Sequence, residues 1–222
     1  MTVAALLPMK GHSERVPGKN FRPLGSKPLY RWMLDSLLAT EAIDQVVINT
    51  DADELLSDDA LIREPRVLLR RRPAELVGDF VSMNLIIEND MSAVDADLYL
   101  MTHATNPFIS PATVSRAIEA FNQSTAHDSL FAVNRFQTRF YREDTSPINH
   151  NPEELIRTQD LEPWYEENSC LYLFTKASFA ATQARIGLKP LMFETPKLES
   201  VDIDEPEDWL LAEALATHME KQ

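Results

Sequence analysis

Short apolar segments alternate with segments of helical periodicity along most of the chain, and this alternation limits the fold more than any other feature. Apolar runs rich in β-branched residues predict strands, whereas apolar residues at three- and four-residue spacing predict helices. Strands are predicted at residues 3–9, 45–50, 66–69, 97–101, 129–133, 169–175 and 190–194. Helices are predicted at residues 28–39, 52–61, 81–89, 111–122, 176–182 and 208–219. Such alternation is typical of an α/β fold with a mostly parallel sheet and helices on both faces.

One domain accounts for the 222 residues, because domains commonly contain roughly 100–200 residues. Residues 134–168 interrupt the alternation, since they are polar, contain three prolines and show no clear period. We expect them to form an arm inserted into the domain, which would suit a dimerisation element.

Composition argues against several classes of protein. A net charge of −14 disfavours nucleic acid and anionic membranes as partners, because both attract basic surfaces. No apolar stretch approaches the roughly 18 residues of a membrane-spanning helix, and the N-terminal segment lacks the basic leader of a secretory signal. The single cysteine, Cys170, excludes a disulfide within the chain and fits a reducing, cytoplasmic compartment. We expect Cys170 to be a buried apolar residue, with a catalytic thiol as the alternative.

Positive charge gathers near the start of this acidic chain. Residues 1–31 hold six lysines and arginines against the single acid Glu14, which suits a small, strongly anionic ligand unless the distribution is chance. Within them, residues 10–27 form a polar loop with three glycines, where backbone amides beside Lys10 and Lys19 would cradle an anion. The loop matches neither the Walker A nor the dinucleotide-binding pattern. Ligands of such sheets bind beyond the carboxyl ends of the strands, so this loop should meet residues 51, 70–79, 102–109 and 202–204.

Several motifs occur in a fixed order along the chain. They are PMKGHSERVPGKN at 8–20, VINTD at 47–51, RPAEL at 72–76, RTQDL at 157–161 and SVDIDEPED at 200–208. Together they resemble the acylneuraminate cytidylyltransferases, the family of CMP-sugar-acid synthetases. The resemblance covers about residues 3–215, and it implies a three-layer, Rossmann-like nucleotidyltransferase fold and a homodimer.

The activity that the resemblance implies is transfer of CMP from CTP to the anomeric hydroxyl of a 2-keto-3-deoxy sugar acid, with release of pyrophosphate. Attack on the α-phosphorus needs cations that hold the triphosphate and a divalent metal such as Mg²⁺. The partners would be CTP and a small anionic or sugar acceptor. Two alternatives remain open, namely transfer to a phosphonate or phosphate acceptor and a non-catalytic nucleotide-binding relative.

The resemblance also implies roles for individual residues. The catalytic cations would be Lys10 and Lys19. The nucleotide would be bound by Gly11, Asn20, Arg72, Asp79 and Ser82. The acceptor would be bound by His103, Thr105, Asn106, Gln159 and Asn168. Alternatives exist for some of them: Asp79 and Ser82 would also suit capping of the helix at 81–89, and His103 would suit either proton transfer or a purely structural strand end. Asp51 would either support the site or cap the next helix.

Two aspartates, Asp202 and Asp204, are the expected metal ligands. Residues two apart on a strand point to the same side, so both carboxylates could share one Mg²⁺, as the matching pair does in the family. The alternative is that the acidic run serves the N-terminus of the last helix, which explains Glu205, Glu207 and Asp208.

The departures from the family pattern gather on the acceptor side. His103 stands where the family has glutamine, and Ile109 and Glu166 stand where it has arginine. Near the phosphate loop, Lys10 replaces arginine and Glu14 replaces lysine. If Glu166 and its neighbour Glu167 line the pocket, the acceptor should carry less negative charge than sialic acid or carry an amine. Otherwise these glutamates are ordinary solvated residues.

Overall fold

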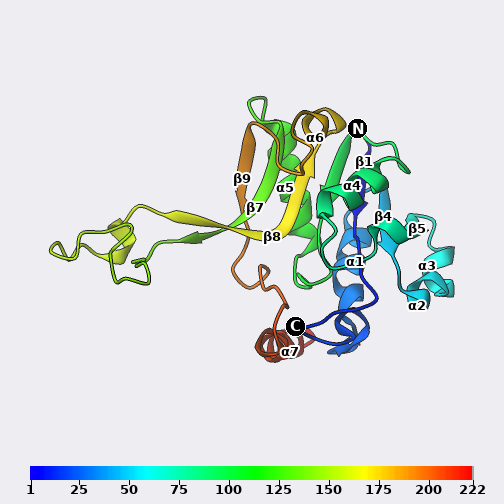
Figure 1. Cartoon of the computed structure of the whole chain (residues 1–222), viewed down its shortest axis with the longest axis horizontal. Helices are drawn as coiled ribbons and strands as arrows, with labels where there is room; N and C mark the ends of the chain where they lie inside the picture. Colours follow the sequence, from blue (N-terminus) through cyan, green and yellow to red (C-terminus); the bar gives the residue numbers. More distant parts are fainter. Residues whose placement is uncertain (222) are drawn as a thin grey trace.

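The computed structural model describes residues 1–221, which form a seven-stranded sheet and a smaller two-stranded one (Figure 1). The larger sheet has the spatial order β5 (Val67–Arg71), β4 (Gln45–Thr50), β1 (Val3–Leu6), β6 (Leu98–Met101), β8 (Trp164–Phe174), β7 (Ser129–Phe136) and β9 (Pro190–Glu194). β8 runs antiparallel to both of its neighbours, whereas the other pairs are parallel. The mostly parallel sheet expected from the sequence is therefore confirmed.

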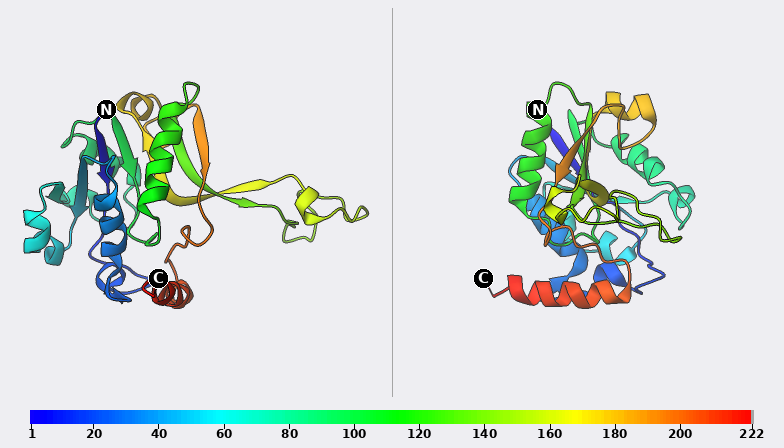
Figure 2. Two further views of the ribbon diagram at one scale, coloured as in Figure 1. Left: turned by 180° about the vertical axis from the view of Figure 1, so that it is seen from behind. Right: turned by 90° about the vertical axis from the view of Figure 1, so that its left-hand side faces the viewer.

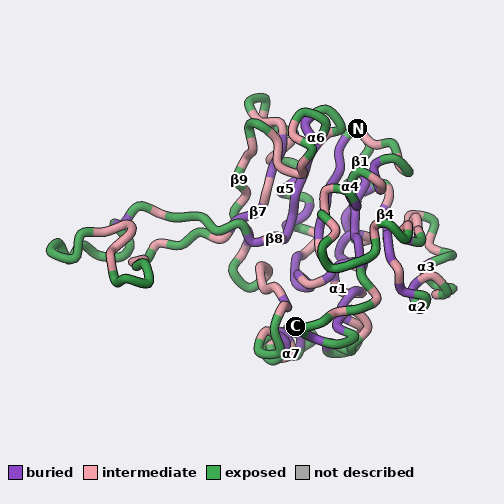
Figure 3. Tube along the Cα trace, viewed as in Figure 1, coloured by how far each residue is buried: buried purple, intermediate pink, exposed green. Residues whose placement is uncertain are grey.

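Helices cover both faces of the sheet, as Figure 2 shows. On one face, α1 (Leu29–Ala39) and α5 (Pro111–Gln123) contribute apolar side chains to a core shared with β4 and β6. On the other, α4 (Met83–Met91) and α6 (Lys176–Thr182) pack on β6 and β8. The buried residues lie along the central strands in Figure 3, so the three-layer architecture is confirmed. No helix of residues 1–221 is long and apolar enough to cross a lipid bilayer.

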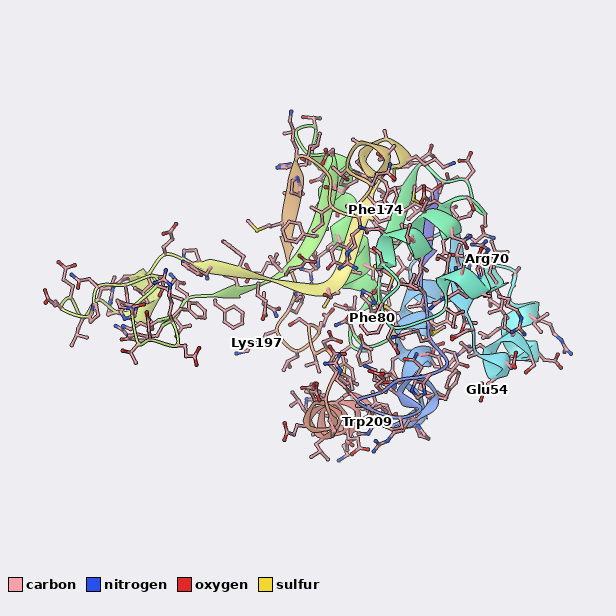
Figure 4. All side chains as sticks on the ribbon, viewed as in Figure 1. Glu54, Arg70, Phe80, Phe174, Lys197 and Trp209 are labelled. Atoms are coloured by element: carbon pink, nitrogen blue, oxygen red, sulfur yellow. The ribbon has the colours of Figure 1, made fainter. Side chains whose placement is uncertain are left out.

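The last helix, α7 (Pro206–Met219), packs against the loop that follows the first strand. Its Trp209, labelled in Figure 4, is buried in a third apolar cluster with Val16 of the first loop, with Phe108 and with Ile203. Packing of this cluster holds residues just before α7 against the phosphate loop predicted from the sequence.

Two local predictions were wrong. The single helix expected at 52–61 is divided into α2 (Asp53–Leu56) and α3 (Asp59–Arg63). The Asp58 side chain accepts hydrogen bonds from the amides of the first turn of α3, so it begins a new helix where periodicity alone suggested continuation. Residues 202–204 form no strand; they are an extended segment whose Ile203 amide donates to the Thr105 carbonyl at 2.9 Å.

The loop expected at 10–27 contains regular structure. A short 3-10 helix (Lys19–Phe21) is followed by a hairpin of β2 (Pro23–Leu24) and β3 (Lys27–Pro28), so α1 begins only at Leu29. The hairpin turns at Gly25, which has a positive φ of 62° that suits glycine.

β7 and β8 continue past the sheet as a two-stranded ribbon that carries the rest of the inserted segment away from the body (Figure 1). The pairing reaches Phe136 and Trp164, so the irregular structure expected at 134–168 is wrong for residues 134–136 and 164–168. The ladder register shifts where the ribbon leaves the sheet, and Ser169 adopts a left-handed φ of 59° there.

Candidate active site

A cavity of about 550 Å³ lies beyond the carboxyl ends of the parallel strands. Its walls come from the loop after β1, the segment after β5, the start of α4, the residues after β6, the turn after α6 and the segment before α7. Its basic lining residues are Lys10, Arg15, Lys19, Arg72 and Arg185. Its acidic lining residues are Glu14, Asp79, Asp202 and Asp204. The cavity therefore offers both cations for an anionic ligand and carboxylates for a metal ion.

Arg72 is held rigidly at the end of β5. Only 4% of it is exposed, and its Nε donates to Oδ1 of Asn49 at 3.0 Å. Its Nη2 donates to the carbonyl oxygens of Asn49 at 2.9 Å and Met9 at 3.2 Å. Burial lowers the pKa of Arg72 below its usual value, yet an arginine remains charged at physiological pH. The result is a fixed cation at one end of the cavity.

Asn49 connects Arg72 to a buried acid on α4. Its Nδ2 donates to Oδ1 of Asp90 at 2.6 Å, and Arg70 also donates to this oxygen at 2.9 Å. Asp90 is fully buried, and burial raises its pKa to about 6, although its bond from Asn49 and the charge of Arg70 act in the opposite direction. This network runs from the face of α4 through β4 to the Arg72 guanidinium at the cavity wall.

The segment expected to form the phosphate loop lines the cavity, and some of its groups already form contacts within residues 1–221. Lys10 forms an ion pair with Asp79 at 2.7 Å. The Asn20 Nδ2 donates to the Lys10 carbonyl at 2.9 Å, while its Oδ1 is buried without a hydrogen-bond partner among residues 1–221. Asn20 lines the cavity, although this oxygen itself is buried.

Asp202 and Asp204 both line the cavity, because Ile203 between them points into the α7 core. Asp204 accepts from Lys19 at 3.2 Å and from Arg15 at 3.1 Å. Burial alone would raise its pKa, but these two cations bring the pKa below its ordinary value. The Lys19 ammonium, 10% exposed, also donates to the Ile203 carbonyl, so it is held against this segment.

Asp202 differs from its neighbour because it forms no ion pair within residues 1–221, although the charge of Lys19 acts to lower its pKa. Burial, followed by the negative charge of Asp204, raises the pKa of Asp202 above its ordinary value despite a hydrogen bond from Thr105. Its Oδ1 is buried with no hydrogen-bond partner among residues 1–221. A buried carboxylate oxygen without a partner is costly unless a cation completes it, so the pair fits a divalent metal. These described residues contain no cluster of three or more metal-binding side chains, so a metal here would need further ligands from substrate or water.

His103 and Thr105 follow β6 and line the cavity. Burial and then the nearby charge of Arg185 lower the pKa of His103 to about 4. The imidazole is therefore neutral at physiological pH and is a weak base, which favours a hydrogen-bonding role over acceptance of the hydroxyl proton.

Five of the residues that the sequence analysis placed in the site do not line the cavity. Gly11 donates its amide to Asp51 at 2.7 Å, so Asp51 supports the loop, and Ser82 caps α4. Asn106 and Asn168 are buried; the Asn168 Nδ2 donates to Thr195 at 2.6 Å. Gln159 lies on the arm, where its carbonyl accepts from Gln137.

The two glutamates that motivated a less anionic acceptor also lie outside the cavity wall. Glu166 accepts from Asn134 on the ribbon at 2.9 Å. Glu167 accepts from the Tyr172 hydroxyl and lies 3.5 Å from Arg185. The observation on which that expectation depended is therefore not met.

Arg185 is the functional candidate that the sequence analysis missed. It follows α6 in a turn that belongs to no motif, and only the folded chain brings it to the cavity. Arg15 was counted only as part of the basic segment, although the motif at 8–20 contains it. Cys170 is buried, and burial raises the pKa of its thiol far above its usual value, which disfavours a catalytic role.

The fold and this cavity define a class of protein before any comparison is made. A parallel sheet with a cation-rich phosphate loop at its carboxyl edge, facing two carboxylates, is an arrangement for handling a nucleotide with a metal ion.

Comparisons with known proteins support this class of protein. The family model described as cytidylyltransferase matches residues 4–221. The CMP-N,N'-diacetyllegionaminic acid synthase of Legionella pneumophila is 27% identical over 97% of this chain and 96% of that protein. N-acylneuraminate cytidylyltransferase A of Danio rerio is 28% identical over 95% of this chain, which spans 50% of that protein. The structure of 4-diphosphocytidyl-2C-methyl-D-erythritol synthase from Anaerococcus prevotii has the same fold, with a TM-score of 0.71, 13% identity and coverage of 97% and 96% of the two chains.

The chain belongs to the cytidylyltransferase family, so it is a nucleotidyltransferase. The family resemblance, the fold and the enzyme class that the sequence motifs implied are thereby confirmed.

Proposed function

We propose that this protein transfers the CMP unit of CTP to the anomeric hydroxyl of a 2-keto-3-deoxy sugar acid of the sialic or legionaminic type. The acceptor oxygen forms a bond to the α-phosphorus, the bond from that phosphorus to the bridging oxygen breaks, and pyrophosphate leaves. The hydroxyl proton passes to water. The observation that carries the proposal is the cavity, whose lining combines Lys10, Lys19 and Arg72 with Asp202 and Asp204.

The nucleotide half of the cavity supplies positioning and charge. Arg72, fixed by Asn49, and the cations of the phosphate loop hold the triphosphate, while Asn20 on the same cavity wall contacts the nucleotide. Lys10 and Lys19 are the catalytic cations, because negative charge that develops on the leaving pyrophosphate is stabilised by fixed positive groups. Their present partners, Asp79 and Asp204, hold them in the cavity before the nucleotide enters.

Asp202 and Asp204 are the residues that would hold Mg²⁺. The buried, unpartnered Oδ1 of Asp202 and the adjacent carboxylate of Asp204 fit a hard divalent cation. When bound, the ion supplies Lewis-acid stabilisation of the phosphate oxygens.

The test is pyrophosphate release by the purified protein with CTP, Mg²⁺ and a panel of acceptors: sialic, ketodeoxyoctonic, pseudaminic and legionaminic acids, and aminoethylphosphonate. We expect release with at least one sugar acid. Release with the phosphonate alone would replace the acceptor class, and CTP binding without any release would indicate a non-catalytic relative.

A matched pair of variants tests the metal assignment. Asp202→Asn should lower the rate about 1,000-fold, because loss of metal stabilisation removes several kcal/mol from the transition state. It should also abolish the Mg²⁺-dependent part of the thermal shift with CTP. Glu207→Gln, an exposed acid on α7, is the control and should leave both unchanged. An unchanged Mg²⁺ response in Asp202→Asn would contradict the assignment.

The projecting arm is the proposed dimerisation element of a cytoplasmic homodimer. Leu155 at 86% exposure and Tyr165 at 45% leave apolar surface on it that a second copy would cover. Light scattering should give twice the 25.2 kDa chain mass, and Leu155→Glu should give the monomer. Leu188→Glu, at a 73% exposed site away from the arm, should leave the dimer intact. A monomeric wild-type protein would contradict this assignment.

A further inference from the structure

The acceptor half of the cavity has lost the arginines of the family pattern, since Ile109 and Glu166 stand at those positions. Ile109 is buried in the core below α1, and Glu166 faces Asn134 on the ribbon, so neither position contributes to this cavity. Yet the pocket is not short of positive charge on that side, because Arg185 enters it from the turn after α6.

We propose that Arg185 binds the carboxylate of the acceptor and so takes over the acid-recognition role of the missing arginines. This inference rests on the proposed function. It assigns the role to a residue from a different element of the fold, and it predicts that the acceptor is a carboxylic acid despite Glu166 and Glu167 in the late motif.

The other basic residues that line the cavity are engaged elsewhere. Lys10 is paired with Asp79, while Lys19 and Arg15 are paired with Asp204. Arg72 donates to three sheet acceptors at the nucleotide end. Within residues 1–221, Arg185 is thus the lining cation on the acceptor side that keeps donor capacity for a ligand.

The contacts of Arg185 fix the plane of its guanidinium group and leave Nη1 only weakly hydrogen-bonded. Its guanidinium carbon lies 3.8 Å from the centre of the Tyr172 ring, and its Nη2 donates to the Tyr172 hydroxyl at 2.9 Å. Its Nη1 makes only long contacts among the described residues, at 3.5 Å to Nε2 of His103 and 3.8 Å to the sulfur of Met101. Contacts of that length are weak, so Nη1 remains available for a carboxylate oxygen.

Glu167 does not cancel this charge. Its Oε1 lies 3.5 Å from Nη2 of Arg185, and its close hydrogen bond is the one from the Tyr172 hydroxyl. The side chain of Arg185 is 21% exposed, which is open enough to meet a ligand and sheltered enough to strengthen the contact.

The chemistry of the acceptor places its carboxylate where Arg185 lies. In a 2-keto-3-deoxy sugar acid the anomeric carbon carries both the carboxylate and the reacting hydroxyl. A cation that binds the carboxylate must therefore lie beside the point of transfer, in the same cavity as the triphosphate cations. Arg185 meets this condition. Its Nη1 lies 3.5 Å from Nε2 of His103, and Thr105, two residues further along the chain, forms a hydrogen bond with Asp202. Two-point binding of this carbon would orient the hydroxyl for attack.

The experiment compares each sugar acid with its methyl ester, which keeps the anomeric hydroxyl but loses the negative charge. The wild-type enzyme should prefer the acid about 10- to 100-fold in kcat/KM, as expected for a charge-assisted arginine–carboxylate contact. Arg185→Gln should lose most of that preference by raising KM for the acid, with the ester and KM for CTP little changed. Arg185→Lys, which keeps the charge but not the two-pronged geometry, should fall between them.

Controls separate the possible failures. Arg63→Gln alters an exposed arginine on α3 that pairs with Asp59, and it should behave as wild type. An unchanged thermal shift with CTP shows that Arg185→Gln is folded, and the acid-to-ester comparison in the wild-type enzyme needs no variant at all. If Arg185→Gln keeps the wild-type preference, or the wild-type enzyme shows none, the role of Arg185 is overturned while cytidylyl transfer stands. If no sugar acid or ester is turned over, the proposed function fails and this inference fails with it.

Discussion

Two arginines mark opposite halves of the cavity, and they are held in different ways. Arg72 is 4% exposed and donates three hydrogen bonds of 2.9–3.2 Å to groups of the sheet and the first loop. Arg185 is 21% exposed in its side chain, stacks on Tyr172 and makes one short hydrogen bond to the same residue. The Arg72 guanidinium is fixed by hydrogen bonds to the sheet and the first loop, whereas the Arg185 guanidinium comes from a turn and packs on one aromatic ring.

The difference fits the two kinds of ligand. Every reaction that this enzyme would catalyse uses a triphosphate. A rigid cation can therefore orient the triphosphate, and it does not need to adapt to different ligands. Acceptors differ among relatives, and a cation carried on a turn changes position or identity without disturbing the sheet. The comparison predicts that damage near Arg72 will affect nucleotide binding and protein stability together, whereas damage near Arg185 will affect only the acceptor.

The largest effect should follow from Arg72→Gln. Loss of a buried, hydrogen-bonded charge typically weakens binding by roughly 2–5 kcal/mol, so the Kd for CTP should rise about 30- to 4,000-fold. Calorimetric titration with CTP provides the measurement. The neighbouring Arg71→Gln is the control, because Arg71 is 63% exposed and pairs only with Asp53 at the surface. Equal losses of CTP affinity in the two variants would show that Arg72 has no special role in CTP binding compared with its neighbour Arg71.

Asp90→Asn tests the buried charge behind Arg72. The folded-state pKa of Asp90 is raised from 3.8 to about 6, so the folded protein binds the proton more tightly than the unfolded chain does. The stabilisation from the protonated form is present below about pH 4 and is lost as the pH rises through 6. The stability of wild type relative to Asp90→Asn should therefore fall by about 2.5 kcal/mol between pH 4 and pH 7.

Urea unfolding across that pH range measures the difference between the two proteins, in which contributions of other carboxylates cancel. Asp95→Asn, which removes a carboxylate that is 90% exposed, is the control for a general change in charge. A flat difference for Asp90→Asn would show that the network behind Arg72 holds no raised pKa.

Asn49→Ala should have a smaller effect on CTP binding than Arg72→Gln, but it should lower both protein stability and CTP affinity. The change leaves Arg72 Nε and the Asp90 carboxylate without their shared partner, which should lower the free energy of unfolding by about 2–3 kcal/mol. CTP binding should weaken about 10-fold, because Arg72 keeps its charge but loses part of its orientation. Asn122→Ala, at an exposed position on α5, should change neither quantity. A loss of stability with unchanged CTP affinity would show that Asn49 does not position Arg72.

Most of the cavity-lining residues that we expect to bind the nucleotide and the metal could be predicted from the sequence, whereas Arg185 could not. Lys19, Arg72, Asp202 and Asp204 follow strands directly or lie in a loop that does, and the rule for ligand sites in parallel sheets brings such positions together. Arg185 follows a helix at the other edge of the sheet, in a turn without a motif. Its place in the cavity depends on the antiparallel β8 and its register shift, which no local pattern reveals.

Polar residues inside predicted strands were the signal that sequence analysis left unused. Asn49 lies in the apolar run of β4 and is fully buried, and a buried amide must find hydrogen-bond partners. That requirement would have pointed to Arg72 and Asp90. For Glu167 no such signal exists, since its bond from Tyr172 depends on a β-bulge that brings two residues of one strand together.

Tyr172→Phe should have the smallest effect and tests how Arg185 is held. The change keeps the aromatic ring under the guanidinium but removes the hydroxyl that accepts from Nη2 and donates to Glu167. Burial and the bond to Glu167 raise the pKa of Tyr172 to about 12, so the hydroxyl stays protonated and makes both bonds at working pH. Loss of one such bond is worth about 1 kcal/mol, so KM for the acceptor acid should rise about 3- to 5-fold.

Steady-state kinetics with the acid and with CTP measure this change in the same assay. Tyr141→Phe, on the exposed arm, is the matched control and should leave both KM values unchanged. KM for CTP should also stay constant in Tyr172→Phe, because Arg72 and its partners lie at the other end of the cavity. If instead Tyr172→Phe weakens CTP binding as much as acceptor binding, the two halves are coupled through the sheet, and the contrast between a rigid nucleotide cation and an adaptable acceptor cation is wrong.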